Sequence, residues 1–317
     1  MEGLVIRTTG SWYRVIVHDN TGDARCFDCR LRGNYRLHGS KQTNPIAVGD
    51  QVRFEIGVDG TGIISEIKDR VNCIVRRATK LSKQTHVIAA NIDLLCIVAT
   101  LAHPRTSTGF IDRLLATAEA YHIKACLIFN KMDLVESDNV LRQTVEIQTE
   151  RYRGIGYAVY HTSAHTGQGI EALKQMITEQ KVLFCGHSGV GKSALLNAMV
   201  PTLDLKEGDV SDWSQKGKHT TTFAEIHPVD LVATEEGITK KTYLIDTPGI
   251  KEFGMVDFDA YELSHCFPEM RERLHGCHFA TCTHRHEPHC AIKAAVEAGE
   301  ISKERYNNYL NILETLE

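Results

Sequence analysis

A glycine-rich segment at residues 186–193, GHSGVGKS, carries the clearest chemical signature in the chain. It matches the phosphate-binding pattern GxxxxGK[ST] at every position and lies between an apolar run, Lys181–Cys185, and a predicted helix, Lys192–Met199. The glycines let backbone N–H groups point at phosphate oxygens, while Lys192 would neutralise the β- and γ-phosphates and Ser193 would ligate Mg²⁺. The sequence therefore predicts a nucleotide site formed by Gly186, His187, Ser188, Gly189, Val190, Gly191, Lys192, Ser193 and Ala194.

A second segment, NKMD at residues 130–133, indicates which base is bound. It follows the apolar run Ala125–Phe129, so it lies at the carboxyl end of a predicted strand, where α/β sheets bind ligands. The Asp133 carboxylate can accept hydrogen bonds from N1–H and N2–H₂ of guanine, and adenine lacks that pair of donors. The TSA segment at residues 162–164 follows another strand, and its backbone can support the base. These two segments predict guanine recognition by Asn130, Lys131, Met132, Asp133, Ser163 and Ala164.

Two further segments predict hydrolysis of the bound nucleotide. Asp246 begins a DTPG segment and can hold Mg²⁺ through water, and the N–H of Gly249 can reach the γ-phosphate. Between the phosphate loop and DTPG lies the segment GKHTTT at residues 217–222. One of its threonines should complete the Mg²⁺ shell, and we favour Thr221. The predicted Mg²⁺ ligands are therefore Ser193 and Thr221, with Lys192 and Thr221 serving catalysis.

The residue after DTPG is Ile250, where a Ras-like enzyme has a glutamine that orients the attacking water. Isoleucine can neither orient water nor accept a proton, so intrinsic hydrolysis should be slow and another group must act. His219, in the loop before the threonines, is the candidate catalytic group. The alternative is that His219 is an ordinary histidine of a surface loop.

Cysteines and a histidine cluster near the end of the chain. Cys277, Cys282, His284 and Cys290 offer three thiolates and one imidazole, a set suited to tetrahedral Zn²⁺. Four protein ligands leave no open position, so one structural Zn²⁺ is predicted; reduced thiols without metal are the alternative. Cys26 and Cys29 form a lone CxxC without a second pair, and we interpret them as structural.

The elements that position these segments alternate from about residue 84 onward. Apolar, strand-like runs occur at 93–100, 125–129, 157–161, 181–185 and 243–245, and helical patterns occur at 111–121, 140–152, 170–179 and 192–199. This alternation predicts a mainly parallel sheet covered by helices. NKMD and TSA precede the phosphate loop, the reverse of the usual GTPase order, so the motifs are circularly permuted. A parallel sheet tolerates this because permutation moves chain ends without moving strands. The final segment carries two predicted helices, at 291–298 and 303–316.

The first seventy residues show short strands instead, at 4–8, 12–17, 24–31, 51–56 and 62–67, separated by turn residues. Five strands in a small module fit an OB-type barrel, and an SH3-like barrel would give nearly the same pattern. Residues 1–83 carry fourteen Lys/Arg and nine Asp/Glu, a net of +5, although the whole chain has a net charge of −4. A basic barrel suits RNA; an ordinary solvated surface is the alternative.

The bulk composition fits a soluble globular protein. The 317 residues suggest two or three domains, with 42% hydrophobic and 24% charged residues. The chain contains no run of eighteen apolar residues, and its first residues do not resemble a secretory signal. Ten cysteines without a disulfide-like pattern agree with a reducing compartment. We therefore expect a cytoplasmic protein that does not insert in membranes, and we expect a monomer.

Taken together, these residues resemble the ribosome small-subunit-dependent GTPases of the RsgA (YjeQ/YloQ) family. The resemblance includes the permuted order, GHSGVGKS, residues 29–33 and 49–52 of the barrel, residues 218–222 and the cysteine spacing. It implies an OB-fold RNA-binding domain at 1–75, a circularly permuted GTPase domain at 76–252 and a zinc-binding, mostly helical domain at 253–317. It further implies GTP and GDP binding, attachment to the 30S ribosomal subunit and its 16S rRNA, and a role in late maturation of that subunit.

Two other functions compete with this one. The chain could be an RNA-binding module that uses GTP as a structural ligand, but the intact set of Lys192, Ser193, Asp246 and Thr221 favours hydrolysis. It could also be a zinc-dependent hydrolase, but four protein ligands leave no position for substrate. Turnover of GTP with and without small subunits would separate the three.

Overall fold

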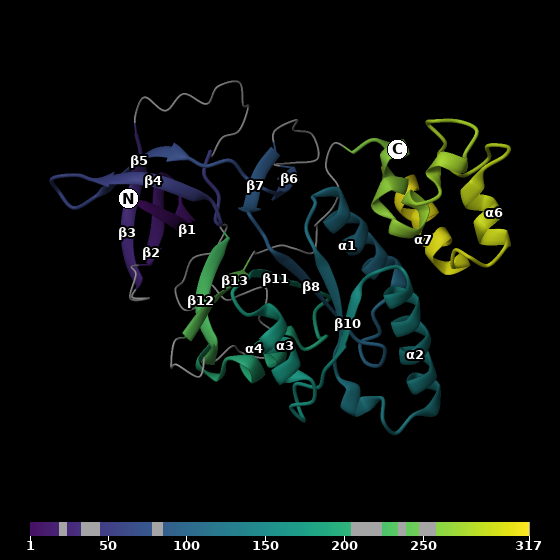
Figure 1. The fold of residues 1–317 in the computed structure, drawn as a ribbon. Helices are drawn as coiled ribbons and strands as arrows, with labels where there is room; N and C mark the ends of the chain where they lie inside the picture. Colours follow the sequence, from purple (N-terminus) through teal and green to yellow (C-terminus); the bar gives the residue numbers. More distant parts are fainter. Residues whose placement is uncertain are drawn as a thin grey trace. The chain divides into compact units, whose positions relative to one another are not determined.

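A computed structural model gives the fold (Figure 1). The structure describes residues 1–18, 24–32, 45–77, 85–203, 224–233, 239–246 and 258–316. The chain divides into two compact units, each made of several segments. The first unit comprises Met1–Leu95, Ile170–Phe184 and Ser193–Ile250, and the second comprises Cys96–Gly169, Cys185–Lys192 and Lys251–Glu317.

Five strands at the start of the first unit form a closed barrel, coloured purple to blue in Figure 1. They are β1 (Glu2–Thr9), β2 (Trp12–His18), β3 (Ala24–Leu31), β4 (Gln51–Ile56) and β5 (Gly62–Ile67). Their order is β1-β2-β3-β5-β4, and β1 also pairs with β4, which closes the sheet. A simple meander would place β4 beside β3, but here β5 lies there and runs parallel to β3. This order confirms the OB-type barrel over the SH3-like alternative.

The barrel core is small and tightly closed. Val5, Val15, Val52 and Phe54 are completely buried, as the two-residue period of their strands requires. Gly62 is needed because a Cβ there would lie 2.3 Å from the sulfur of Cys29.

The two cysteines of the lone CxxC occupy different environments. Cys29 is buried, and burial raises the pKa of its thiol to about 12, while Cys26 is exposed. Positions three apart on a strand face opposite sides of a sheet, so these cysteines cannot act as a ligand pair.

The rest of the first unit contains elements that the sequence did not reveal. Strands β6 (Cys73–Arg77) and β7 (Thr85–Ala90) pair antiparallel, and so do β12 (Glu225–Ala233) and β13 (Thr239–Asp246). The predicted strand at 243–245 is thus the end of a longer one, which also pairs in parallel with β11 (Lys181–Cys185). The described part of the first unit also contains α3 (Ile170–Ile177), most of α4 (Lys192–Met199) and a 3-10 turn, η2 (Pro201–Leu203).

Strand β8 (Leu94–Ala99), which belongs to the second unit from Cys96 onward, neighbours β9 (Ala125–Phe129), and β9 pairs in parallel with β10 (Ala158–His161). All six residues of β8 are buried, as expected for a strand covered on both faces. Helices α1 (Thr108–Ala120) and α2 (Asn139–Gly154) follow β8 and β9. Helix α1 begins one turn earlier than the hydrophobic pattern predicted because Ser107 caps it by accepting from the N–H of Phe110.

The C-terminal part of the second unit is mostly helical. It contains η4 (Ala260–Cys266), α5 (Pro268–Arg271), η5 (Leu274–Gly276), α6 (Ala291–Glu297) and α7 (Lys303–Glu314). These helices pack around Phe267, Tyr309 and Ile312, and Ala116 of α1 joins the same core. The predicted division at residues 75 and 252 stays a prediction. Within the described ranges, every helix is too short or too polar to cross a bilayer.

Candidate nucleotide-binding and metal sites

The predicted phosphate loop is a tight turn from the end of β11 to the start of α4. Its glycines are required by close approaches as well as by backbone angles. A Cβ on Gly186 would lie 2.2 Å from the carbonyl oxygen of Val98. Gly191 has φ +87, and a Cβ there would lie 2.6 Å from Nδ2 of Asn130. The loop can therefore present backbone N–H groups closely to an anion in front of a helix N-terminus.

The side chain of Lys192 arches over this loop. Its Nζ donates to the carbonyl oxygens of Gly186 at 2.6 Å and His187 at 2.7 Å. These contacts hold the ammonium group beside the loop, where it can meet phosphate oxygens. Ser193 follows and is buried, and Ala194 continues the first turn of α4.

Asn130 ties three of the predicted segments together. Its Nδ2 donates to the carbonyl of Val190 in the phosphate loop at 2.9 Å. Its Oδ1 accepts from the hydroxyl of Thr162 at 3.1 Å and from the N–H of Ala164 at 3.3 Å. Because Asn130 is 2% exposed, these hydrogen bonds satisfy a buried amide and also fix the spacing of phosphate loop, NKMD and TSA.

Asp133 and Ser163 are also in contact, because the Ser163 hydroxyl donates to Oδ1 of Asp133 at 2.5 Å. The N–H of Met132 donates to the carbonyl of Thr162 at 3.1 Å, which brings the two loops together. Lys131 has φ 63, and its Nζ donates to the carbonyl of His103 at 2.9 Å. NKMD and TSA therefore form one edge, at the carboxyl ends of β9 and β10.

The remaining predicted residues are only partly described. Asp246 is the last residue of β13, at the strand end where it was expected. His219, Thr221, Gly249 and Ile250 lie outside the described residues. Their assigned roles stay predictions.

The structure adds residues that motif matching missed, on the segment that follows β8. The ring of Phe110 stacks on the imidazole of His187, with ring centroids 3.7 Å apart and planes at 27°. A Cβ on Gly189 would lie 3.3 Å from the ring of Pro104. This segment starts at the carboxyl end of a strand, which is the signal that could have identified it. Partial burial, and then the nearby Lys192 ammonium, lower the pKa of His187, which favours its neutral imidazole.

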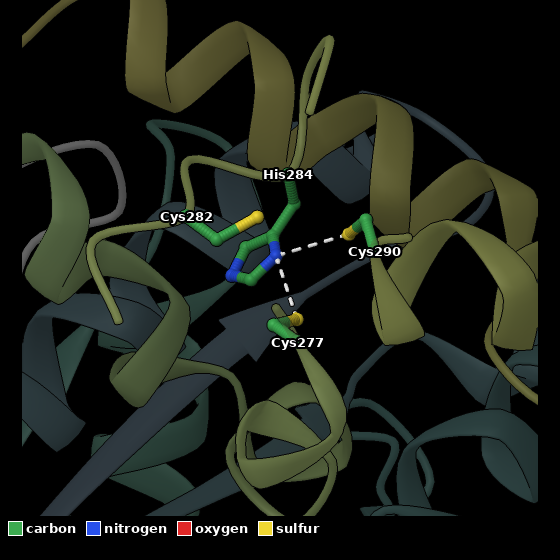
Figure 2. Close-up of side chains that lie close together, drawn as sticks. All are labelled: Cys277, Cys282, His284 and Cys290. Atoms are coloured by element: carbon green, nitrogen blue, oxygen red, sulfur yellow. Dashed lines mark hydrogen bonds between the residues drawn. The ribbon is translucent and has the colours of Figure 1, made fainter. Parts of the chain in front are cut away.

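The four predicted zinc ligands gather into one cluster (Figure 2). The candidate donor atoms of Cys277, Cys282, His284 and Cys290 all lie within 4.8 Å of one another. Nδ1 of His284 lies 3.7 Å from the sulfur of Cys277 and 3.3 Å from that of Cys290. Ligands around tetrahedral Zn²⁺ are separated by about 3.5 Å, given Zn–S and Zn–N bonds of about 2.3 and 2.0 Å. The donor set and its spacing therefore fit Zn²⁺, with Nδ1 as the histidine ligand.

A carboxylate organises the loop that carries these ligands. Glu287 accepts from the N–H and the hydroxyl of Thr283 and from the N–H groups of Arg285 and His286. Burial alone would raise the pKa of Glu287, but these hydrogen bonds outweigh it and lower the pKa to about 2. From α7, the hydroxyl of Tyr306 donates to the carbonyl of His284 at 2.6 Å. The loop is thus fixed both internally and by α7.

A phosphate loop that follows NKMD and TSA in the chain is the arrangement of a circularly permuted P-loop GTPase, here joined to an OB-type barrel and a Cys/His cluster. Comparison with known proteins agrees with this assignment. Residues 67–256 match the RsgA GTPase family, and residues 2–64 match the RsgA N-terminal domain. The chain belongs to the RsgA family of GTPases, and it is a GTP hydrolase.

Relatives match over the full length. The small ribosomal subunit biogenesis GTPase RsgA of Bacteroides fragilis is 46% identical, with 100% of this chain and 97% of that protein covered. The protein of the same name from Phocaeicola vulgatus is 48% identical with the same coverage. The crystal structure of YjeQ from Thermotoga maritima matches with a TM-score of 0.75 and 34% identity, covering 99% of this chain and 98% of that one. YloQ, described as a circularly permuted GTPase, matches with a TM-score of 0.75 and 31% identity, covering 99% and 94%.

Proposed function

We propose that this GTPase acts in biogenesis of the small ribosomal subunit and that the subunit stimulates its GTP hydrolysis. The observation that carries the proposal is full-length identity of 46–48% to proteins named for that process. More specifically, we propose that the protein acts late in maturation of the 30S subunit and attaches to it through 16S rRNA.

The barrel surface supports attachment to RNA. Strands β2 and β3 expose Arg14, Arg25 and Arg30, and Trp12 is 38% exposed. The guanidinium of Arg30 lies over the indole of Trp12, 3.8 Å from the ring centroid. Arginines interleaved with an exposed aromatic ring suit phosphates and unstacked bases. Attachment through this surface should weaken as salt rises, because phosphate contacts release counterions.

In the proposed mechanism, the carboxylate of Asp133 selects guanine and Ser163 and Ala164 support the base. Lys192 neutralises the β- and γ-phosphates, the N–H of Gly249 contacts the γ-phosphate, and His219 orients or activates water. Ser193, Thr221 and, through water, Asp246 would hold Mg²⁺, which would supply further charge neutralisation. Zn²⁺ at the Cys/His cluster has a structural role. We expect the protein to work as a cytoplasmic monomer.

The test is steady-state GTP turnover with and without purified small subunits, with large subunits as the specificity control. The variant Lys192→Ala measures the GTPase background that the subunits themselves carry. We expect slow turnover alone and a clear increase with small subunits. If turnover were equally slow with and without small subunits, stimulation by the subunit would be ruled out.

A further inference from the structure

The phosphate loop is anchored at His187 from two sides. Its carbonyl oxygen accepts from Nζ of Lys192 at 2.7 Å, and its imidazole stacks on Phe110 at 3.7 Å between ring centroids. His187 is otherwise an exposed residue of the loop. The conformation of the loop at this position therefore depends on where Phe110 is held.

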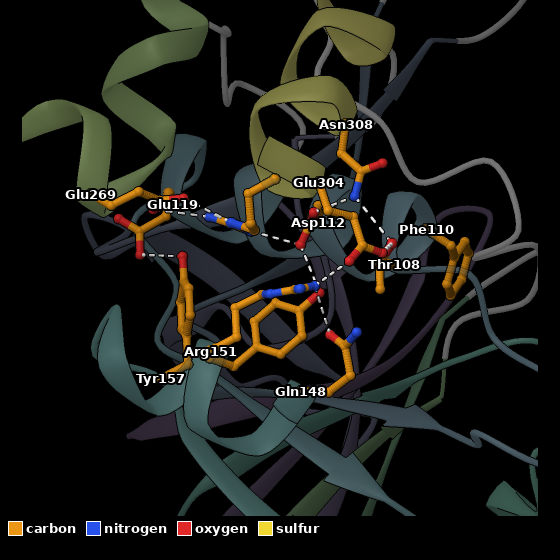
Figure 3. Close-up of polar contacts among 12 residues, drawn as sticks. Thr108, Phe110, Asp112, Glu119, Gln148, Arg151, Tyr157, Glu269, Glu304 and Asn308 are labelled. Atoms are coloured by element: carbon orange, nitrogen blue, oxygen red, sulfur yellow. Dashed lines mark hydrogen bonds and ion pairs between the residues drawn. The ribbon is translucent and has the colours of Figure 1, made fainter. Parts of the chain in front are cut away.

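Phe110 lies in the first turn of α1, and α7 holds that turn (Figure 3). The hydroxyl of Thr108 donates to Glu304 at 2.6 Å and accepts from Nδ2 of Asn308 at 3.2 Å. Gly109 permits this close packing, since a Cβ there would lie 3.3 Å from Oδ1 of Asn308. The turn that carries Phe110 is thus bound to α7 through the two residues just before the aromatic residue.

One turn further along α1, buried charges hold the same two helices together. Arg305 of α7 donates to Asp112 of α1 at 2.6 Å and to both carboxylate oxygens of Glu269 at 2.7 and 3.0 Å. Arg305, Asp112 and Glu269 are 2%, 0% and 7% exposed. Shifting one helix along the other would leave buried charges unpaired, which is strongly unfavourable. The cluster therefore permits a single register of α1 against α7.

Helix α7 is also the helix that holds the Cys/His loop. The hydroxyls of Tyr306 and Tyr309 donate to the carbonyls of His284 and Thr283 at 2.6 and 2.9 Å. Contacts therefore run without interruption from the Cys/His loop through α7 and α1 to Phe110 and the phosphate loop.

We propose that Phe110 is a positioning residue for the bound nucleotide: α7 holds it in place, and it holds the phosphate loop at His187. The inference rests on the proposed nucleotide site, and it adds that the C-terminal helices help to set nucleotide affinity. Because the stack acts on the loop before any reaction, its loss should affect ground-state binding more than kcat.

The experiment measures dissociation of a fluorescent GDP analogue by stopped flow, together with KM and kcat for GTP. Phe110→Ala should speed dissociation and raise KM by about two- to tenfold, the range expected for one aromatic pair, with little change in kcat. Phe110→Tyr keeps the ring and should restore the wild-type rate. Tyr261→Ala removes an exposed aromatic ring of the same unit and should change nothing.

Two further variants separate positioning from general destabilisation. Thr108→Val removes the hydroxyl between Glu304 and Asn308 and should speed dissociation in the same direction, by less. His187→Ala should speed dissociation of the analogue as much as Phe110→Ala does. The double variant should release the analogue no faster than either single variant, because both changes remove the same stack.

Two outcomes would overturn the inference: additive effects of the two single changes, or wild-type dissociation from Phe110→Ala. If the wild-type protein itself failed to bind the analogue, the proposed nucleotide site would be wrong instead.

Discussion

NKMD, TSA and the phosphate loop form the edge that we propose binds the nucleotide, here called the nucleotide-binding edge. This edge and the Cys/His cluster both bring together distant residues, but they hold them differently. At the nucleotide-binding edge, polar side chains have protein partners: Asn130 bonds Val190, Thr162 and Ala164, and Asp133 accepts from Ser163. In the Cys/His cluster, Nδ1 of His284 has two of the thiols themselves as its neighbours.

This difference predicts how each region responds to loss of its ligand. Hydrogen bonds within the protein pre-organise the nucleotide-binding edge, so it should keep its structure without GTP. The three thiols and the imidazole are held together by binding a common cation. Metal binding is therefore coupled to folding here, and the cluster should lose its structure without metal. The nucleotide-binding edge can therefore exchange its ligand, whereas the Cys/His cluster should retain its metal.

The largest expected effect is removal of the metal. The purified protein should contain about one Zn²⁺ per chain, and Cys282→Ser should lose it and unfold the C-terminal helices locally. Zinc binding in such sites contributes on the order of 10 kcal/mol that is coupled to folding. Metal analysis and thermal unfolding measure the two results, with Cys26→Ser, an exposed barrel thiol, as the control. Absence of zinc together with a normal melting curve for Cys282→Ser would rule out the site.

The next effect is loss of hydrolysis without loss of structure. Lys192→Ala or Ser193→Ala should lower GTP turnover by at least about 100-fold, because each removes a group that stabilises charge on the phosphates. The melting temperature should change little, since Nζ of Lys192 donates to carbonyl oxygens of its own loop, those of Gly186 and His187. Measurable turnover near the wild-type rate in either variant would contradict the phosphate-loop assignment.

A smaller effect tests base recognition. Asp133→Asn should weaken GTP binding by about 2–4 kcal/mol, since a charged acceptor for two donors is lost, and should shift preference toward xanthine nucleotides. Asparagine can still accept from Ser163, so the edge should remain intact. Glu136→Gln, an exposed loss of charge three residues later, is the matched control for titration calorimetry. Unchanged GTP affinity in Asp133→Asn would remove the guanine site from this edge.

The smallest variant effect concerns His219. Replacement by alanine should lower turnover at least about tenfold and change GTP affinity far less, since the proposed role exists only in the transition state. His265→Ala, at an exposed histidine in the C-terminal part, should behave as wild type in both measurements. Equal turnover in His219→Ala and wild type would leave the water-activating group unassigned.

The sequence predicted those parts of the molecule that local patterns determine. Strands β3, β4, β5, β9 and β11 have the expected bounds because alternation and turn residues mark them, and the Cys/His spacing led directly to the cluster. Strand β12 was missed because EIHPVDLVA contains a proline and charges that argue against a strand.

Contacts between distant residues could not be predicted in the same way. Arg305 and Asp112 are 193 residues apart, and a charged residue on a helix is ordinarily read as solvated. The stack of Phe110 on His187 likewise depends on how α1 packs, which no local pattern encodes.

The most direct test of the proposed function is co-sedimentation with small ribosomal subunits in a non-hydrolysable GTP analogue and in GDP. In the chain, DTPG leads directly into the C-terminal segment. The nucleotide state can therefore bias the arrangement of the parts of the protein that bind the subunit. By reciprocity, a subunit that favours the GTP-bound arrangement must also tighten binding of the analogue. We predict that more protein pellets with the subunit in the analogue than in GDP, and that higher salt reduces pelleting in both. Equal pelleting in the two nucleotides would contradict nucleotide-controlled action on the subunit.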